Sequence, residues 1–398
     1  MPRRDAGEPE ADRPMPIRAG WKTCRDAAVA AVLAASTAGC GAGQVPLGVI
    51  LPLSGPGAAY GQMAKKGIDL AADQIAAQGG VHGKRLAVQY RDSKGVPSAG
   101  LEAAIDLIDR EGVSAIIGDL FSDVTLEVAA ECERRQVVLF SPGSSVPRLS
   151  QAGLYVFRNY PSDALEGAYV AQIASEKLRL LDLVVISVAN AYGQGLREAF
   201  LKYYSGPNRE VHKVITFPDG SPDPASIAAQ VEELRPDGIY LIAYDQDRLS
   251  ILEALRGRDI KARILGTRDS RDLILKAGAA AEGMLVPLDE YDPAAADPVV
   301  QDFVKKYGEK YGGEQPGLWA AQAYDAVLLV ARAMNEAGGE YGQDVQIKLA
   351  AISGFRGVTG VTDLDANGDV SRRPRMHVVQ GGALVPYEEF EAQQAPAP

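Results

Sequence analysis

The chain has 398 residues, of which 46% are hydrophobic and 23% charged, and its formal net charge is -11. This composition is typical of globular proteins and excludes a disordered or low-complexity chain. No run of 18 or more apolar residues occurs, which excludes a protein with several membrane spans. The negative charge and the lack of a long basic stretch argue against nucleic acid as a partner, since binding it needs a dense positive surface.

Residues 1–39 have the layout of a secretory signal peptide. Basic residues precede a short apolar run at 27–36, and small residues follow that run as far as Cys40. The ending Ala-Gly-Cys resembles a bacterial lipoprotein signal, in which Cys40 is lipidated and 40–44 forms a linker behind the anchor. An ordinary cleaved signal with an incidental cysteine is the alternative. Met15 fits the start of such a signal better than the first Met, because the residues before it are of mixed charge and rich in proline.

Strands and helices alternate through the first part of the chain. VPLGVILPL at 45–53 is a short apolar run closed by Ser-Gly-Pro-Gly, which predicts a buried strand followed by a loop. Apolar residues at helical or alternating spacing predict the elements that follow. We expect helices at 64–75, 101–108 and 125–135, and strands at 86–90, 115–118 and 137–140. This βαβα order predicts a parallel sheet with helices on both faces.

The same alternation restarts after a polar join at 158–162 and ends in a hairpin at 377–385. We expect strands at 183–188, 211–217, 238–243, 263–265 and 283–287, and helices at 164–177, 195–204, 224–234, 249–256, 298–311 and 318–337. The predicted fold class is α/β, with two doubly wound parallel-sheet lobes. Parallel sheets bind ligands beyond the carboxyl ends of their strands, so the cleft between the lobes is the expected site.

Eight motifs resemble the leucine/isoleucine/valine-binding protein family, which are the type I periplasmic solute-binding proteins of ABC importers. They occur in the family's order and span nearly the whole chain after the signal. The motifs are LGVILPLSGPGAAYG (47–61), GGVHGKRLAVQYRD (79–92), IIGDLFSDVT (116–125), VVLFSPGSSVPRLS (137–150), FRNYPSD (157–163), AYGQGL (191–196), AEGMLV (281–286) and AYDAVLL (323–329).

The resemblance implies that the chain crosses between the two lobes three times, which makes a three-segment hinge. The matching positions are Arg158–Pro161, Leu285–Leu288 and Val358–Thr362. One lobe would then hold 45–159 and 288–359, the other would hold 160–287 and 360–390, and 391–398 would be a flexible tail.

The resemblance also implies a ligand held through its carboxylate at the lobe interface. Matching by motif, that carboxylate would meet Ser122 after the third strand and main-chain groups of Gly143, Ser144 and Ser145. A hydroxyl and several N–H groups at strand ends and helix starts form an anion site without a formal charge. The alternative is that these residues form only a loop and a helix cap.

Three tyrosines match pocket positions of the family. Tyr60 lies in the first loop, Tyr192 precedes a Gly-Gln-Gly turn, and Tyr244 follows a strand. Each offers a ring face for an apolar group or a cation, and a hydroxyl group. The alternative is that they are partly buried loop tyrosines.

One position departs from the family pattern. The amino-acid binders of the family place a Glu there to pair with the ligand ammonium, whereas the aligned residue here is Arg268. A buried ammonium beside an arginine is strongly unfavourable unless a carboxylate intervenes. Either an acid takes over, with Asp269 next in sequence, or the ligand carries a second anionic or neutral polar group. Further acids in site loops are Asp119, Asp123 and Asp245. Alternatively, Arg268 points to solvent.

The resemblance implies a solute-binding lipoprotein in the periplasm or at the cell surface. It would capture a small polar ligand, an amino acid or an amino-acid-like carboxylate, and deliver it to the permease subunits of an ABC importer. Amides and aromatic or dicarboxylic acids are alternative ligands. A ligand-sensing receptor of the same fold is an alternative role. We expect the chain to act as a monomer.

No catalytic residues, cofactor or metal are expected. The sequence has no phosphate loop and no Ser/His/Asp set. Three His and three Cys are too few and too scattered for a structural zinc site. Asp363, Asp365 and Asn367 resemble the first half of a calcium loop, but Pro374 stands where such a loop needs a Glu. We interpret this stretch as a turn.

Overall fold

The computed structural model describes residues 43–204, 206, 208–268, 274, 276–288, 291–338 and 341–394. The expected signal peptide, Cys40, Asp269 and residues 395–398 lie outside this part of the chain.

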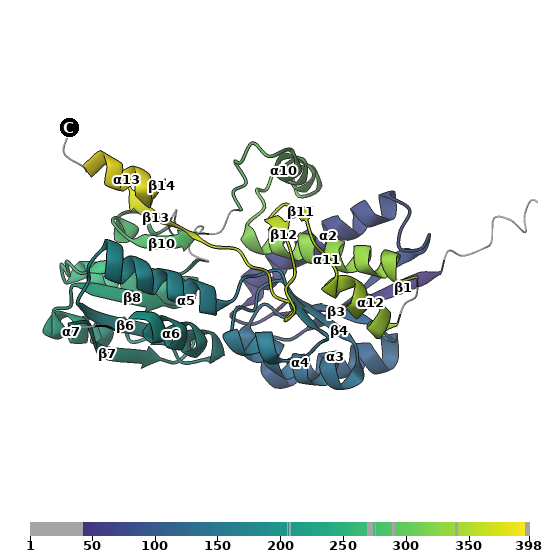
Figure 1. Ribbon diagram of the computed structural model, residues 1–398, viewed down its shortest axis with the longest axis horizontal. Helices are drawn as coiled ribbons and strands as arrows, with labels where there is room; N and C mark the ends of the chain where they lie inside the picture. The colour runs from purple at the N-terminus through teal and green to yellow at the C-terminus, as the bar shows by residue number, and fades with distance from the viewer. Residues whose placement is uncertain are drawn as a thin grey trace, which may run out of the picture. The chain divides into compact units, whose positions relative to one another are not determined.

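The first sheet has five parallel strands. Their order is β2 (Arg85–Asp92), β1 (Gln44–Leu51), β3 (Ala115–Gly118), β4 (Val138–Ser141) and β5 (Val156–Arg158). Alternate strand residues face two separate hydrophobic clusters, because side chains of a strand point to opposite faces in turn. Val49 packs with the helices of one face, and Ile50 with those of the other. The sheet is thus covered on both sides, as predicted (Figure 1).

Four helices pack on the face that Val49 contacts, and two on the face that Ile50 contacts. The first group is α2 (Ala58–Ala77), α10 (Pro298–Lys310), α11 (Leu318–Ala337) and α12 (Gly342–Ala350), and the second is α3 (Pro97–Asp106) and α4 (Ser122–Arg135). The long helices α10 and α11 therefore return to the first lobe after the chain has built most of the second.

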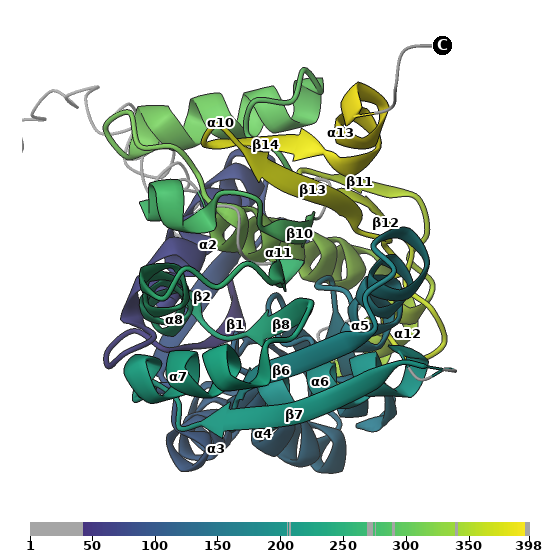
Figure 2. The same ribbon diagram turned by 90° about the vertical axis from the view of Figure 1, so that its left-hand side faces the viewer.

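The second sheet has seven strands. Their order is β14 (Ala383–Pro386), β13 (Arg375–Gln380), β10 (Leu285–Leu288), β9 (Arg263–Leu265), β8 (Gly238–Ile242), β6 (Asp182–Val188) and β7 (Glu210–Phe217). The hairpin of β13 and β14 is antiparallel, as predicted, and β13 joins the parallel part of the sheet through β10 (Figure 2). Among the described residues, the helices of this lobe include α5 (Asp163–Gln172), α6 (Ala191–Tyr204), α7 (Pro224–Leu234), α8 (Asp245–Gly257) and α13 (Tyr387–Gln394).

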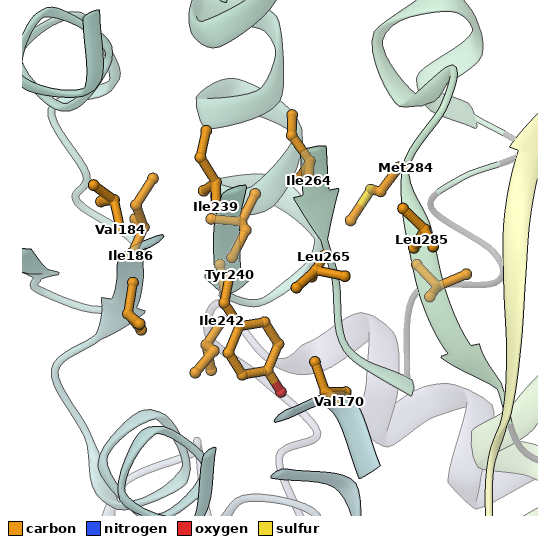
Figure 3. Packing of buried hydrophobic residues seen from close by; sticks show 14 of the residues in the cluster. Val170, Val184, Ile186, Ile239, Tyr240, Ile242, Ile264, Leu265, Met284 and Leu285 are labelled. Atoms are coloured by element: carbon orange, nitrogen blue, oxygen red, sulfur yellow. The ribbon is translucent and has the colours of Figure 1, made fainter. Parts of the chain in front are cut away.

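One hydrophobic core fills the second lobe. Buried residues of neighbouring strands lie side by side in register, with Ile239 between Val184 and Ile264, and Val170 of α5 packs near the Tyr240 ring (Figure 3). Strands that are buried on both faces account for the continuous apolar runs in the sequence.

The third crossing between the sheets lies later in the chain than expected. Strands β11 (Phe355–Gly357) and β12 (Gly360–Thr362) form a ribbon, and Val358 belongs to the first lobe's core. The Gly368 carbonyl still accepts a hydrogen bond from the backbone N–H of Arg158 at 2.9 Å. The chain therefore leaves the first lobe after Gly368, not at 358–362, because the Asp- and Gly-rich turn folds it back onto β5.

Two further segments differ from the sequence prediction. Leu285–Leu288, expected to be a crossing, is strand β10 of the second sheet, so the chain leaves that sheet only after Leu288. Residues 391–394, expected in a flexible tail, belong to helix α13, where Tyr387 and Phe390 pack against the core.

Candidate functional site

A cavity of about 30 Å³ lies among loops that follow the strands of both sheets. Residues from both lobes line it: Tyr60, Leu120, Phe121, Ser122, Gly143, Ser145, Tyr160, Asp163, Glu166, Tyr192, Tyr244, Arg268 and Trp319. Most of these residues follow the carboxyl end of a strand or begin the next helix, which is where parallel sheets place ligand sites.

Seven of the residues expected to bind a ligand line this cavity together: Tyr60, Ser122, Gly143, Ser145, Tyr192, Tyr244 and Arg268. Ser144 is fully buried, with its Oγ 3.4 Å from the Oγ of Ser122. Asp269 lies outside the described residues.

Several polar groups of the serine-rich loop after β4 already form hydrogen bonds within the protein. The Ser141 hydroxyl accepts from the backbone N–H of Ser144 at 2.9 Å and from that of Gly143 at 3.4 Å. The Ser145 hydroxyl donates to Oδ2 of Asp163 at 2.9 Å. An incoming anion would therefore meet Ser122, which opens helix α4 beside the cavity. N–H groups in a first helical turn point toward such a ligand.

Six aromatic side chains form a continuous chain of ring contacts around the cavity. Successive ring centroids are 5.3 to 6.1 Å apart along the series Tyr160, Trp319, Tyr60, Phe121, Tyr244 and Tyr192. Most of these pairs are edge-to-face or tilted, the arrangement that aromatic quadrupoles favour. Such a wall favours an apolar or aromatic group of a ligand.

Arg268 faces the cavity and not the solvent. Its Nε lies 2.7 Å from Oε2 of Glu166, and both side chains are 1% exposed. The backbone N–H of Arg268 also donates to Oε1 of Glu166 at 3.2 Å, and the guanidinium lies 5.6 Å from the centre of the Tyr160 ring. The arginine that replaces the family's glutamate is thus paired with a glutamate from another helix.

Sequence reasoning missed the two acids of the cavity. Asp163 and Glu166 lie three residues apart in the first turn of α5, which places both on one helix face. The sequence feature that could have identified these two acids is their position directly after a predicted lobe crossing. Trp319 and Tyr160 were also missed, although the chain has only two tryptophans and Tyr160 lies in a family motif.

The three other acids that sequence reasoning considered do not line this cavity. Asp119 accepts hydrogen bonds from the Ser93 hydroxyl and the backbone N–H of Phe121. Asp245 pairs with Arg248 at 3.4 Å. Asp123 accepts from a backbone N–H of the other lobe.

Besides the bond from Ser145 to Asp163, two backbone N–H groups of the second lobe donate to side chains of the first lobe beside the cavity. Both carboxylate oxygens of Asp123 accept from the backbone N–H of Ala191, the first residue of α6, at 3.1 and 3.2 Å. The backbone N–H of Asp245, the first residue of α8, donates to the Tyr60 hydroxyl at 3.3 Å. Each bond links a side chain of the first lobe to a helix start of the second.

Two doubly wound lobes, joined by crossing segments around a shared cavity, define the class of two-lobed ligand-binding proteins. Along the described ranges, no helix combines the length and apolar character that crossing a membrane requires.

Comparison with known proteins assigns the family. A family model described as "Periplasmic binding protein" matches residues 44–383, and the chain belongs to this family, in its type I, leucine/isoleucine/valine-binding branch. The chain is 26% identical to a Leu/Ile/Val-binding protein homolog of Brucella suis, covering 86% of this chain and 91% of the relative.

Two solved structures share the fold. One is a branched-chain amino acid transporter substrate-binding protein of Streptococcus pneumoniae in complex with isoleucine, with 27% identity and a TM-score of 0.77 over 86% of this chain and 97% of that one. The other is a leucine-binding protein of Thermotoga maritima, with 28% identity and a TM-score of 0.77 over 85% and 97% of the two chains. These neighbours are binding proteins and not enzymes, and the protein described here is a solute-binding protein of the ABC-transporter class.

Proposed function

We propose that the protein captures a small carboxylate solute, an amino acid or a close analogue, in the cavity between its lobes and delivers it to an ABC permease. The observation that carries this proposal is the joint lining of one cavity by Ser122 of the first lobe and by Tyr192, Tyr244 and Arg268 of the second. The isoleucine and leucine named for the two structural neighbours support the ligand class.

Ligand capture would be coupled to lobe closure. The ligand carboxylate accepts from Ser122 and the first turn of α4, while the aromatic wall covers the remainder of the ligand. The bonds from Asp123 to α6 and from Tyr60 to α8 hold the lobes together. A ligand that contacts both lobes binds the closed state better than the open state, which shifts the population toward closure. The permease would recognise this closed state, and the protein would act as a monomer.

The test is a screen for ligand-induced stabilisation, followed by calorimetry. The panel includes the common amino acids, amides, and aromatic and dicarboxylic acids. A true ligand at about 100 times its Kd stabilises the fold by roughly 2.7 kcal/mol, which raises the Tm measurably. If no compound in the panel raises the Tm, the proposed ligand class is wrong.

We further propose that Cys40 carries a lipid that tethers the protein to the membrane. The support is the sequence ending Ala-Gly-Cys after the apolar run. In the producing bacterium, wild type should fractionate with membranes and C40S should be released in soluble form. C132S is the matched control, because it changes a cysteine that is buried in α4. A wild-type protein that is soluble and begins after Cys40 would contradict the anchor.

A further inference from the structure

A second cavity lies directly beside the first one, between the same two lobes. Its volume is about 150 Å³, and the side chains of Tyr60, Phe121 and Tyr244 line both cavities. The Phe121 ring is in edge-to-face contact with the Tyr60 ring and with the Tyr244 ring. We call this second cavity the outer chamber. Only a partition of three side chains separates it from the cavity that Ser122 lines.

The cavity at Ser122 is too small for a whole solute. A space of about 10–15 Å³ is needed to hold one water molecule, so a cavity of about 30 Å³ admits a group of a few atoms, such as a carboxylate. The outer chamber is several times larger. A solute whose carboxylate meets Ser122 therefore has to place the remainder of its chain past the three rings, in the outer chamber.

The start of helix α4 connects the two spaces. Ser122 lines the cavity, and Asp123, the next residue, lines the outer chamber. Successive Cα atoms are about 3.8 Å apart. A hydroxyl that can bind an anion and a carboxylate that can bind a cation thus lie on neighbouring residues but in different chambers, so that one elongated molecule can contact both.

The outer chamber has an excess of negative charge to which both lobes contribute. Among the described residues, the charged side chains of its lining are Lys94 and Asp123 from the first lobe and Asp219 and Asp247 from the second. Three carboxylates and one ammonium give a formal charge of two negative. Asp247 is 7% exposed, so its charge is only weakly screened by solvent.

Each of the three carboxylates accepts a hydrogen bond from a neutral group. The donors are the backbone N–H of Ala191 for Asp123, the backbone N–H of Gly220 for Asp247 and the side chain of Asn190 for Asp219. Such bonds orient the carboxylates without cancelling their charge. Partial burial raises the pKa of Asp219, and the charges of Asp247 and Asp123 raise it further, although the bond from Asn190 lowers it. The carboxylates of the two lobes therefore repel one another.

A cation in the outer chamber would remove this repulsion. Like charges that face each other across an interface are unfavourable, and here Asp123 of the first lobe faces the two acids of the second. A cationic group placed among them attracts both lobes at once. It therefore favours the closed state over the open state, in which the carboxylates are farther apart.

We propose that the ligand is an elongated solute with a carboxylate at one end and a cationic group, an ammonium or a guanidinium, at the other. The carboxylate binds Ser122, and the apolar middle of the molecule lies against the rings that separate the two chambers. The cation binds among the carboxylates of the outer chamber. This inference rests on the proposed function and makes the outer chamber a determinant of ligand specificity.

The test compares ω-amino carboxylates with plain carboxylates of the same chain length by calorimetry. The pairs are 5-aminopentanoate with pentanoate and 6-aminohexanoate with hexanoate, which differ only in the terminal ammonium. For wild type, at least one amino member should bind about fivefold or more tightly than its partner, the upper end for an ion pair at a partly exposed site. This comparison needs no variant and therefore does not depend on the folding of a mutant protein.

Two variants with opposite expected effects form the second arm, and their readout is the ratio of the two affinities within a pair. D247N keeps an oxygen that can accept from Gly220 and loses the charge, so the preference for the amino member should fall about threefold. K94Q removes the cation of the same chamber, so this preference should rise about twofold. A merely structural disturbance would change both members of a pair alike.

E253Q is the matched control for D247N. Glu253 is an exposed acid of the same helix, α8, and lines neither the cavity nor the outer chamber. The E253Q variant should show the same ratio of affinities as wild type.

The outcomes separate the two proposals. If the amino members bind no more tightly than the plain carboxylates, or if D247N and K94Q leave the ratio unchanged, the outer chamber does not bind a cation, while the proposed capture of a carboxylate stands. If no member of either pair binds but the wider panel gives a carboxylate without a cationic end, the elongated solute is likewise the wrong class. If no compound binds at all, the proposed function fails as well.

Discussion

Ser122 occupies the position where a single hydroxyl has the largest expected effect on binding. It opens helix α4, lines the cavity and is 2% exposed. We expect S122A to remove one charged hydrogen bond worth about 1.5–3 kcal/mol, which is roughly a 10- to 150-fold loss of affinity. Calorimetry with the best ligand measures the change.

The control for S122A is S226A, which removes an exposed serine from the first turn of α7 in the second lobe. The S226A variant should bind the ligand with the same affinity as wild type. If S122A also binds with wild-type affinity and unfolds at the same urea concentration, Ser122 does not contact the ligand.

Asp119 makes the stability of the loop before Ser122 sensitive to pH. Burial raises the pKa of Asp119 to about 6, although hydrogen bonds from Phe121 and Ser93 lower it. The folded protein therefore binds this proton more tightly than the unfolded chain, whose Asp pKa is about 3.9. The stabilising contribution is fully present below about pH 4 and is lost as the pH rises through about 6.

We expect D119N to remove this part of the pH dependence. The free energy of unfolding of wild type, relative to D119N, should fall by about 2–3 kcal/mol between pH 4 and pH 7. Urea unfolding of both proteins at several pH values in that range measures it. Parallel pH profiles for the two proteins would show that Asp119 is not the source.

At the scale of elements, Asp123 of α4 joins the first lobe to the start of α6 in the second. A carboxylate at a helix N-terminus is worth about 0.3–1 kcal/mol. D123N should therefore weaken ligand binding about two- to fivefold by favouring the open state, although Asp123 does not line the cavity.

The control for D123N is E127Q, which removes an exposed carboxylate from the same helix. Calorimetry gives the affinities, and small-angle scattering with saturating ligand reports the closure. Equal affinity and equal scattering for the two variants would show that the bond to α6 does not contribute to closure.

Long periodic segments made most elements predictable from the sequence. The apolar runs of β1, β6 and β8 and the helical spacing of α11 are strong signals because these elements are buried. Strand β5 has three residues and helix α12 has nine, too few for a clear period. The third crossing was misplaced because hydrogen bonds between Arg158 and the turn at 365–369, more than two hundred residues apart in sequence, hold that turn against β5.

The candidate site was predictable where a family motif carries it. Ser122, Gly143, Ser145 and the three tyrosines were found in this way. The sequence also predicted a charge conflict at Arg268. The sequence did not show that Glu166 pairs with Arg268 and so removes this conflict. Glu166 is 102 residues away from Arg268 in sequence, and the two side chains meet only because α5 folds against the end of β9.

At the scale of the whole molecule, one buried arginine connects the cavity loop to two crossing segments. Arg158 ends β5, pairs with Asp369 at 2.7 Å and donates to the carbonyl of Val146 at 3.0 Å. The loop that holds Gly143 and Ser145 is thus tied to the segments about which the lobes would move. Such a connection lets a ligand at the loop influence the hinge.

The central claim is that a small carboxylate binds between the lobes, and the most direct test is a crystal structure of the protein with the tightest ligand from the screen. We predict ligand density in the cavity, with the carboxylate within hydrogen-bond distance of Ser122 Oγ and the remainder of the molecule against the rings of Tyr60, Tyr192 and Tyr244. Density for that ligand elsewhere on the protein, with this cavity empty, would contradict the account.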